Sequence, residues 1–328
     1  MAATEGLSDD GGEIEARFGL RHTLEQVKRD TTARFGMYVL AIVFAVAIFT
    51  TVDAYLSTIT FGRYENYHFA ELLPILENPE RVPAPPYSTW DVPAWEQGGS
   101  WANPLGTDHQ GRDYLSRLIY GTRVSVTVGI FATLVGAVGG TVIGAVSGYY
   151  GSWVDEALMR FVEMIYAIPP LVLVIVFTVF VSGNNPDIQY AVLGVGIAAM
   201  PVFARIIRSR VLSIREMEYI EAAKAAGVKE RHIILRHVIP NSFAPVIVYA
   251  SLYAGIAILI VAGLSFLGYG AQAPTPDWGR MISVAHQTQM HVNPIASIWP
   301  GFAILITVMG FNLLGDGLQD ALDPRIDN

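Results

Sequence analysis

The chain has 328 residues, of which 52% are hydrophobic and 15% charged, and its mean hydropathy is +0.40. A soluble protein of this length carries about a quarter charged residues, so the composition indicates an integral membrane protein. There is no cysteine, which excludes disulfides, thiolate metal sites and cysteine nucleophiles. The net charge of −8 comes largely from the two tails and from the segment between the first two apolar runs.

Six apolar runs are long enough to cross a hydrocarbon core of about 30 Å. They are continuous rather than alternating, which indicates helices, because a helix satisfies all its backbone polar groups within lipid. The six predicted spans are residues 35–59, 124–149, 164–181, 188–207, 243–267 and 294–314. We therefore predict an all-α, polytopic membrane protein with six transmembrane helices.

An even number of spans puts both termini on one side of the membrane. Residues 150–163 and 205–242 lie on that same side, which holds 15 of the 21 Lys and Arg residues. Basic residues accumulate in cytoplasmic segments. We therefore expect both termini and residues 205–242 in the cytoplasm, and the proline- and tryptophan-rich loop 61–121 outside it.

The second predicted span carries four glycines spaced four residues apart: Gly136, Gly140, Gly144 and Gly148. This spacing puts them on one helix face, where the absence of side chains lets another helix approach closely. The face is either a seam between moving or dimerising helices or a tight contact within one bundle. The sequence does not distinguish these two interpretations.

Prolines interrupt the third to fifth spans at Pro169, Pro170, Pro201 and Pro245. Proline removes a backbone donor and kinks a helix, which suits a bundle that opens and closes around a path. Static membrane proteins also contain such kinks. These three spans are therefore only candidates for the lining of a path.

Ionisable residues are nearly absent from the span centres, although ion-coupled carriers usually keep them there. Asp53 lies near the outer end of the first span, so we interpret it as an interfacial acid. No HExxH motif is present, and the histidine spacings do not indicate a metal site. None of the three lysines follows the phosphate-binding pattern GxxxxGK[ST]. We expect no catalytic residue, metal or cofactor in this chain, and energy for transport would have to come from another subunit.

A charged segment, residues 213–242, separates the fourth and fifth spans. SIREMEYIEAAKAA is rich in strong helix formers, Gly227 interrupts it, and KERHIILRHVI continues to Pro240. The pattern predicts a helix, a sharp turn and a second helix. Such a pair either docks into a groove on a partner or lies as an amphipathic connector on lipid headgroups. The residue pattern favours neither.

EAAKAAG followed by HVIPN resembles the EAA-loop signature of ABC-importer permeases. The family pattern is EAA, three residues, Gly, nine residues and I-x-L-P. Here His237 stands at the isoleucine position and Ile239 at the leucine position. The form RHxxPN resembles the dipeptide/oligopeptide/nickel branch of the family.

Four more segments resemble the second permease subunit (DppC/OppC-like) of that branch. They are residues 103–126, 149–169, 263–282 and 311–325. The resemblance implies a type I ABC-importer transmembrane domain in the cytoplasmic membrane of a prokaryote. The implied division is a cytoplasmic tail (1–36), a first transmembrane helix (37–60), an extracytoplasmic loop (61–121), the transmembrane domain (122–315) with the EAA coupling loop (213–242), and a cytoplasmic tail (316–328).

The resemblance also implies partners. They are a second homologous permease, two cytoplasmic ATPase subunits or domains that bind ATP and Mg, and an extracytoplasmic substrate-binding protein, all assembled in lipid without nucleic acid. The implied function is import of di- or oligopeptides, or of a related solute such as nickel, glutathione or oligosaccharides, by alternating access. The alternative is an ion-coupled secondary carrier that works without ATPase subunits.

The same resemblance assigns the ATPase-facing turn to the EAA residues and to Gly227, which allows the backbone to reverse. The residues expected to take part in ATPase coupling are Tyr219, Glu221, Ala222, Ala223, Gly227, Val228, Ile234 and Pro240. Among these we expect Tyr219, Val228 and Ile234 to support the turn by packing. In GRDYLSR, we expect Arg112 and Asp113 to make structural pairs at an outer gate rather than to bind substrate.

Overall fold

The computed structural model describes residues 20–61, 76, 93, 101, 103–183, 187–288 and 294–322. Among these residues every regular element is a helix, and the β pairing is limited to an isolated bridge between Thr107 and Asp113. Most of the loop predicted over 61–121 lies outside the described residues, as do most of the N-terminal tail and the end of the C-terminal tail. The predicted all-α class is confirmed for the part of the chain that is described.

The helices differ greatly in length, from single turns to a helix of 37 residues. In chain order they are α2 Leu20–Arg29, α3 Thr31–Phe61, α4 Tyr114–Tyr150, α5 Ser152–Tyr166, α6 Pro170–Ser182, α7 Ile188–Ile214, α8 Glu218–Ala225, α9 Glu230–Ile233, the π-helix η2 Ile234–Val238, α10 Ile239–Asn241, α11 Ala244–Phe266, α12 Trp278–Thr288, the 3-10 helix η3 Pro294–Ser297 and α13 Ile298–Leu322.

Five of the described helices are long and apolar enough to cross a membrane: α3, α4, α7, α11 and α13. The third predicted span is different. Its first three residues end α5, and the rest forms α6, which is bent by 92° from α5. The break falls at Pro169 and Pro170, since proline lacks the N–H that a continuous helix needs and disfavours helical backbone in the residue before it. The interruption predicted at these prolines is a sharp bend, and the span count is six if the bent pair is counted as one span.

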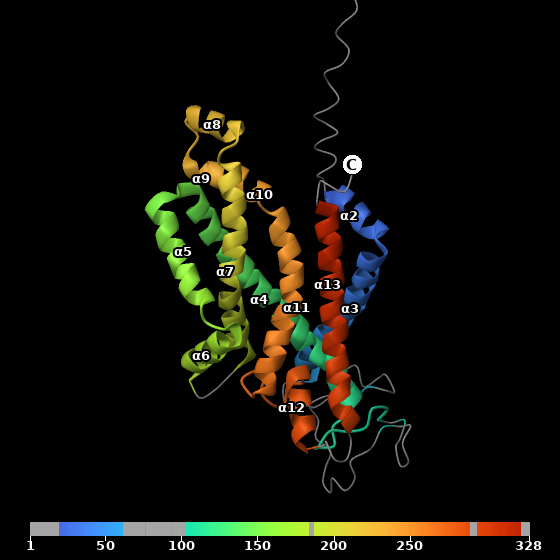
Figure 1. The fold of residues 1–328 in the computed structure, drawn as a ribbon. Helices are drawn as coiled ribbons and strands as arrows, with labels where there is room; N and C mark the ends of the chain where they lie inside the picture. The colour runs from blue at the N-terminus through green and yellow to red at the C-terminus, as the bar shows by residue number, and fades with distance from the viewer. Residues whose placement is uncertain are drawn as a thin grey trace, which may run out of the picture.

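The long helices run side by side between two ends of the bundle (Figure 1). At one end, called here the α8 end, lie α8, α9, α10, α2 and the last turn of α13. At the opposite end, the α12 end, lie α12 and the start of α4. The first described helix and the last one thus reach the same end as the charged segment, as an even span count predicts. Which side of the membrane this end faces stays a prediction.

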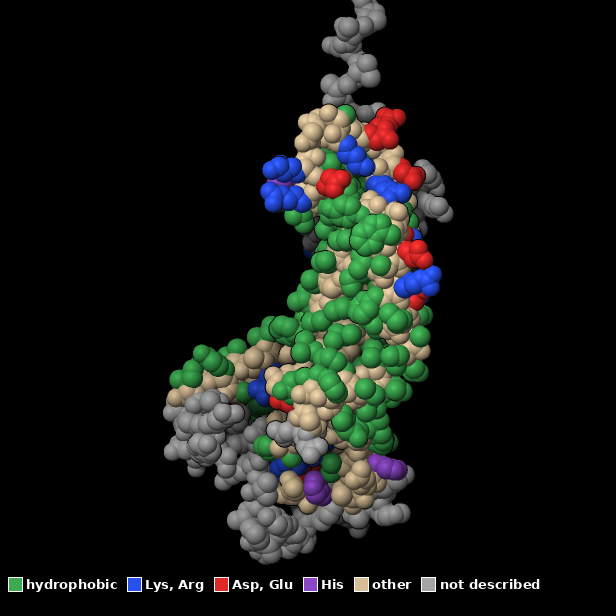
Figure 2. Space-filling model, turned by 90° about the vertical axis from the view of Figure 1, so that its left-hand side faces the viewer, with side chains coloured by type: hydrophobic (Ala, Val, Ile, Leu, Met, Phe, Trp, Pro, Cys, Tyr) green, Lys and Arg blue, Asp and Glu red, His purple; other side chains and the backbone are tan. Residues whose placement is uncertain are grey.

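Much of the bundle surface is apolar. Figure 2 shows hydrophobic side chains covering its middle, with Lys, Arg, Asp and Glu gathered mainly toward the α8 end. Along residues 35–59 of α3, no exposed side chain is charged, and those exposed include Ile42, Ile48 and Tyr55. Such a face is suited to contact lipid hydrocarbon, because the hydrocarbon contains no water to solvate charged or polar side chains.

The four glycines of α4 face α7 within the same chain. A Cβ added at Gly140 would lie 2.4 Å from the Cβ of Phe203, and one at Gly144 would lie 2.3 Å from the carbonyl oxygen of Ala204. Gly136 and Gly148 meet α7 in the same way. We call this contact the α4–α7 seam. Of the two interpretations of the glycine pattern, the geometry corresponds to tight packing within one bundle.

A second glycine contact, between α3 and α13, was not predicted from the sequence. A Cβ at Gly36 would lie 2.8 Å from the Cβ of Leu313, and one at Gly317 would lie 2.1 Å from the Cβ of Ala33. These glycines do not recur at four-residue spacing within one helix, so the pattern that revealed the α4–α7 seam is missing here. The contact fixes the first span against the last.

Asp53 also differs from its predicted position. It is only 4% exposed and accepts a hydrogen bond from the hydroxyl of Tyr120 in α4. An acid at the surface of an interface would be solvated instead. The side chain is buried between α3 and α4 because Tyr120 supplies the donor that a carboxyl group needs when it leaves water.

The α4–α7 seam predicts that alanine substitution lowers stability more at Gly144 than at Gly301, although both glycines lie in apolar helices. In the Gly144→Ala variant the new methyl group meets backbone, so we expect the protein to lose about 1–3 kcal/mol of stability. In Gly301→Ala the added Cβ has nothing within 4 Å, so we expect a change within about 0.5 kcal/mol. Thermal unfolding of both purified variants in the same detergent measures this difference, and equal melting temperatures would contradict it.

Candidate functional site

The predicted helix–turn–helix segment is present at the α8 end (Figure 1). The extended backbone of Met217 separates the long helix α7 from α8. The first turn of α8 carries Glu218 and Glu221. Acidic residues stabilise the start of a helix because the unpaired N–H groups there are partly positive. Ile220 is fully buried and attaches the short helix to the bundle.

Gly227 makes the turn between the two helices. Its φ is +77°, in the left-handed region that glycine adopts without strain. The N–H of Gly227 donates to the carbonyl of Lys224 at 3.0 Å, and that of Val228 donates to the carbonyl of Ala223 at 3.1 Å. This pair of bonds is the Schellman motif, which closes a helix and reverses the chain. The sequence prediction of a reversal at Gly227 is therefore confirmed.

The second helix of the segment changes its pitch. After one α-turn in α9, the chain forms the π-helix η2, in which the N–H of Ile239 donates to the carbonyl of Ile234. Pro240 follows at once in α10. Proline cannot donate and its ring needs space in the preceding turn, which the wider π-turn provides. Asn241 and Ser242 donate their side chains to the carbonyls of His237 and Val238.

The inner side of the segment is apolar and continuous with the core of the bundle. Ile233, Ile234 and Val238 are buried, and they join a cluster that includes Tyr149 at the end of α4 and Ile214 at the end of α7. Each buried side chain of this size contributes about 1.5–3 kcal/mol. The segment is therefore packed on the ends of α4 and α7.

Polar contacts strengthen this attachment. The guanidinium of Arg215, the residue after α7, donates to the carbonyl of Gly148 at 3.1 Å and to that of Tyr149 at 3.4 Å. These carbonyls belong to the last turn of α4, where a cation is stabilised by the helix dipole. The ammonium of Lys224 lies 5.3 Å from the centre of the Tyr149 ring. Neither contact was predicted, because both join residues that are far apart in sequence.

The outer side of the segment is open. Glu221, Ala222, Gly227 and Pro240 are exposed, Ala223 is half-buried and Ile234 is buried. Of the three residues expected to support the turn by packing, Ile234 is buried in the bundle. Tyr219 is 42% exposed, with its ring edge-on to that of His237 at 6.4 Å between ring centres, and Val228 is 40% exposed. Leu235 is 68% exposed. The EAA residues are thus at least partly exposed, together with Tyr219, Val228 and Leu235.

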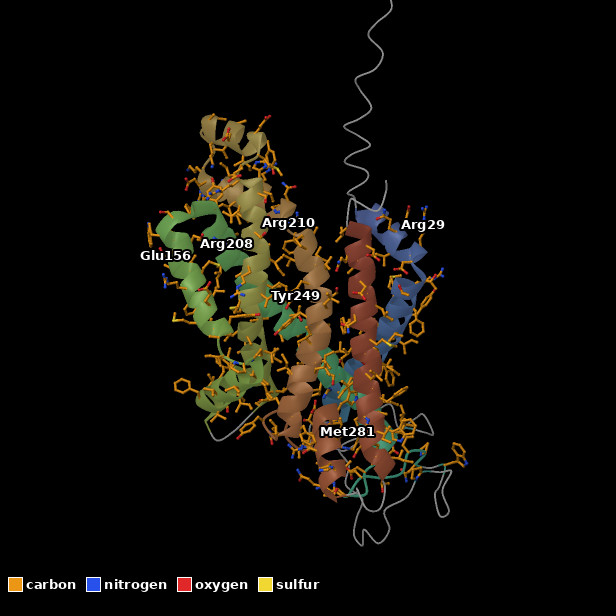
Figure 3. The ribbon with its side chains drawn as sticks, in the orientation of Figure 1. Arg29, Glu156, Arg208, Arg210, Tyr249 and Met281 are labelled. Carbon is orange, nitrogen blue, oxygen red and sulfur yellow. The ribbon has the colours of Figure 1, made fainter. Side chains whose placement is uncertain are left out.

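An ion pair ties α5 to α7 just below this segment. Asp155 accepts hydrogen bonds from Nε and from a terminal nitrogen of Arg208, both at 2.6 Å, and it also accepts one from the hydroxyl of Ser147 in α4. Figure 3 shows Arg208 on α7, on the side of α5. The bidentate geometry is the strong form of this pair. The sequence contained both residues but no signal that they meet.

The predicted outer-gate residues lie at the α12 end. Arg112 does not pair with Asp113; its Nε donates to Asp108 at 2.7 Å, and Arg117 lies 3.4 Å from the same carboxylate. Asp113 caps α4 by accepting the N–H of Ser116 at 2.7 Å. Burial raises the pKa of the Asp113 carboxyl. These contacts are structural, and a gating role for them stays a prediction.

No group of three or more His, Cys, Asp or Glu side chains among the described residues is arranged to hold a metal ion. The described features therefore define a polytopic helical membrane protein that carries a surface-facing helical turn anchored on two of its spans.

Residues 140–328 match the family model described as binding-protein-dependent transport system inner membrane component. The chain belongs to this family of transport permeases. It is 45% identical over 230 residues to the dipeptide transport system permease protein DppC of Alkalihalophilus pseudofirmus, which covers 70% of this chain and 74% of the relative. It is 40% identical over 237 residues to the glutathione transport system permease protein GsiD of Pectobacterium atrosepticum, which covers 72% and 77%. It is 41% identical over 234 residues to DppC of Haemophilus influenzae, which covers 71% and 78%.

Two solved structures share the fold. Both come from inward-facing conformations of the MetNI methionine ABC transporter. The first has a TM-score of 0.51 at 18% sequence identity, and the match covers 64% of this chain and 98% of the solved chain. The second has a TM-score of 0.52 at 16% identity, and the match covers 63% of this chain and 97% of the solved chain. The predicted fold class, the transmembrane domain of an ABC importer, is confirmed.

The two ion pairs of α5 provide a matched test of the α5–α7 contact. The side chains of Asp155 and Arg208 are 18% and 34% exposed, whereas those of Glu156 and Arg160 are 67% and 75% exposed. We expect Asp155→Asn to destabilise the protein by about 1 kcal/mol, because it leaves the guanidinium without its counter-charge. Glu156→Gln should change stability by less than about 0.5 kcal/mol. Thermal unfolding in detergent measures both, and a larger loss in Glu156→Gln would reject the ranking.

Proposed function

We propose that this chain is a permease subunit of an ATP-driven ABC importer that moves di- or oligopeptides, or a related peptide such as glutathione, into the cell. The observation that carries the substrate class is the high identity, over 70% or more of this chain, to permeases named for dipeptide and glutathione transport. Solute selection in such a system is shared with a separate binding protein. The permease is proposed to supply the path, which opens alternately to each side.

We propose that the exposed surface of α8 and the Gly227 turn is the docking site for a cytoplasmic ATPase subunit. Two features support this role. The turn presents the EAA residues outward, and its inner side is packed on the ends of α4 and α7. A force applied to the turn would therefore reach two membrane helices directly, which is the physical requirement for rigid-body coupling between distinct sites. ATP and Mg would be bound by the ATPase subunits.

The proposed assembly contains a second homologous permease, two ATPase subunits or domains and an extracytoplasmic binding protein. The α8 end would face the cytoplasm, with both termini, in accordance with its Lys and Arg content. The proposed coupling loop is 213–242 within a transmembrane domain of 122–315, preceded by a separate first span. An ion-coupled carrier acting alone does not agree with membership of a binding-protein-dependent family.

Co-purification tests the assembly. When this chain is tagged and extracted from its native membrane in mild detergent, we expect one homologous permease and ATPase subunits to elute with it in fixed ratio. Transport of a peptide by the isolated chain in proteoliposomes without ATP would contradict the importer function and favour the carrier.

The Gly227 turn gives a test of coupling with a matched control. Gly227 and Gly183 both have a positive φ, +77° and +61°, and a Cβ at either would have nothing within 4 Å. A non-glycine residue at either position is strained by about 1–3 kcal/mol. Gly183, with a ψ of −125°, lies outside the left-handed helical region and is the more strained of the two positions. We expect Gly227→Val to abolish stimulation of ATP hydrolysis by the loaded binding protein, while Gly183→Val, at the α6–α7 turn, retains it.

The measurement is ATPase activity of the assembled complex in nanodiscs, with membrane insertion checked for both variants. Unchanged stimulation in Gly227→Val would mean that the segment is only a surface connector. Equal loss in both variants would mean that backbone strain, not docking, is responsible.

A further inference from the structure

One open face of the bundle is not apolar. α7 packs on α4 along the seam formed by residues such as Ala199, Phe203 and Ile207. With 3.6 residues per turn, Arg205 lies on the opposite face, and its side chain is exposed. Ser209, one turn further, is exposed on the same face. α7 lies between α5 and α11 in Figure 1 and contacts both helices.

α5 and α11 each contribute a tyrosine. Tyr166 is the last residue of α5 and is exposed, and its ring lies under the guanidinium of Arg205, with 4.2 Å between the guanidinium carbon and the ring centre. Tyr249 of α11 packs edge-on against Phe203 of α7 with 5.0 Å between ring centres. Figure 3 shows Tyr249 near mid-height of the bundle.

The depth of Arg205 is unusual for an arginine near the end of a span. Such side chains normally extend toward the nearer water interface. Here the guanidinium stacks on the ring of Tyr166, which ends α5 at the bend into α6, at the end of that helix away from the α8 end (Figure 1). Position 166 also lies inside the third predicted span. A cation held at this depth on an open face needs water or an anion beside it, since lipid hydrocarbon offers neither.

Among the described residues, no carboxylate lies within ion-pair distance of Arg205, although Arg208 on the same helix is fully paired with Asp155. The exposed face of α3 along residues 35–59, in contrast, has no charge at all. The bundle therefore has one face suited to lipid and another on which an exposed arginine, with no carboxylate partner among the described residues, stacks on a tyrosine.

We propose that Arg205, Tyr166 and Tyr249 form a solute-contact site on the water-filled path of the importer, where the guanidinium binds the carboxylate of a passing peptide. This inference rests on the proposed function and names a part of the path. A guanidinium presents paired donors that fit a carboxylate, and the two hydroxyls can donate to or accept from peptide groups. The site uses the broken pair α5–α6, α7 and α11, the three spans in which prolines suggested a path.

The experiment uses the absence of cysteine from this chain. Val202 lies one turn from Arg205 on the same face of α7, so a Val202→Cys variant places a single thiol beside the guanidinium. The assembled complex with its ATPases is embedded in nanodiscs and labelled with an anionic methanethiosulfonate (sulfonatoethyl) or a neutral one (hydroxyethyl). Mass spectrometry of this chain gives the two labelling rates. Because a thiolate reacts in water, labelling reports a wet face.

We expect both reagents to label the thiol of the Val202→Cys variant. When Arg205→Gln is added, the ratio of the anionic to the neutral labelling rate should fall about threefold, because one unit of positive charge is removed from the neighbouring helix turn. Arg210→Gln, which removes an arginine from another face of the same helix, should leave the ratio unchanged. Trialanine at high concentration should slow labelling by the neutral reagent, and trialanine amide should not. Arg205→Gln should remove this protection.

Several results would overturn the site. An unreactive thiol in the Val202→Cys variant would mean that the partner permease or lipid covers this face. Equal protection by trialanine and its amide, or none by either, would exclude carboxylate binding. A labelling ratio that changes when anionic lipids are replaced by phosphatidylcholine, with no effect of the peptide, would assign Arg205 to lipid headgroups. Stimulation of ATP hydrolysis by the loaded binding protein is measured on the same samples. If stimulation is normal while the peptide gives no protection, the Arg205 site is wrong but the importer function stands.

Discussion

The close approach of α4 and α7 is the contact on which the rest of this permease depends. Four glycines of α4 allow the backbone of α7 to lie directly against it, so the two helices form one stiff unit. Every other functional part is attached to that unit. The charged segment is packed on its α8 end, the Asp155–Arg208 pair holds α5 to its side, and α11 packs against α7 through Phe203.

The coupling role proposed for the Gly227 turn depends on this arrangement. The segment that carries the Gly227 turn is packed on the ends of α4 and α7 through Ile220, Ile233 and Ile234, and Arg215 adds a polar contact to the last turn of α4. A displacement at the turn is therefore transmitted by packed atoms rather than by a flexible loop. Because close-packed interiors resist compression, the α4–α7 unit would move as a body.

The two open faces of the bundle have different chemistry, and this difference is informative. The exposed side of α3 along residues 35–59 is apolar, whereas the exposed side of α7 carries Arg205 over Tyr166. In lipid, an arginine is tolerated only beside water, an anion or protein. The position of one cation thus distinguishes a face that contacts lipid from one that contacts the solute path, a distinction that hydropathy alone does not make.

The sequence by itself determined the helical class, the approximate spans and the reversal at Gly227, because apolar length, helix-forming residues and a left-handed glycine are local properties. The resemblance of the EAA segment to importer permeases also required no structure. Only the tertiary structure decided that the glycines of α4 face α7, that Asp53 is buried against Tyr120, and that Arg208 is paired while Arg205 is not. These facts depend on which distant residues meet, and that is set by the packing of whole helices against one another.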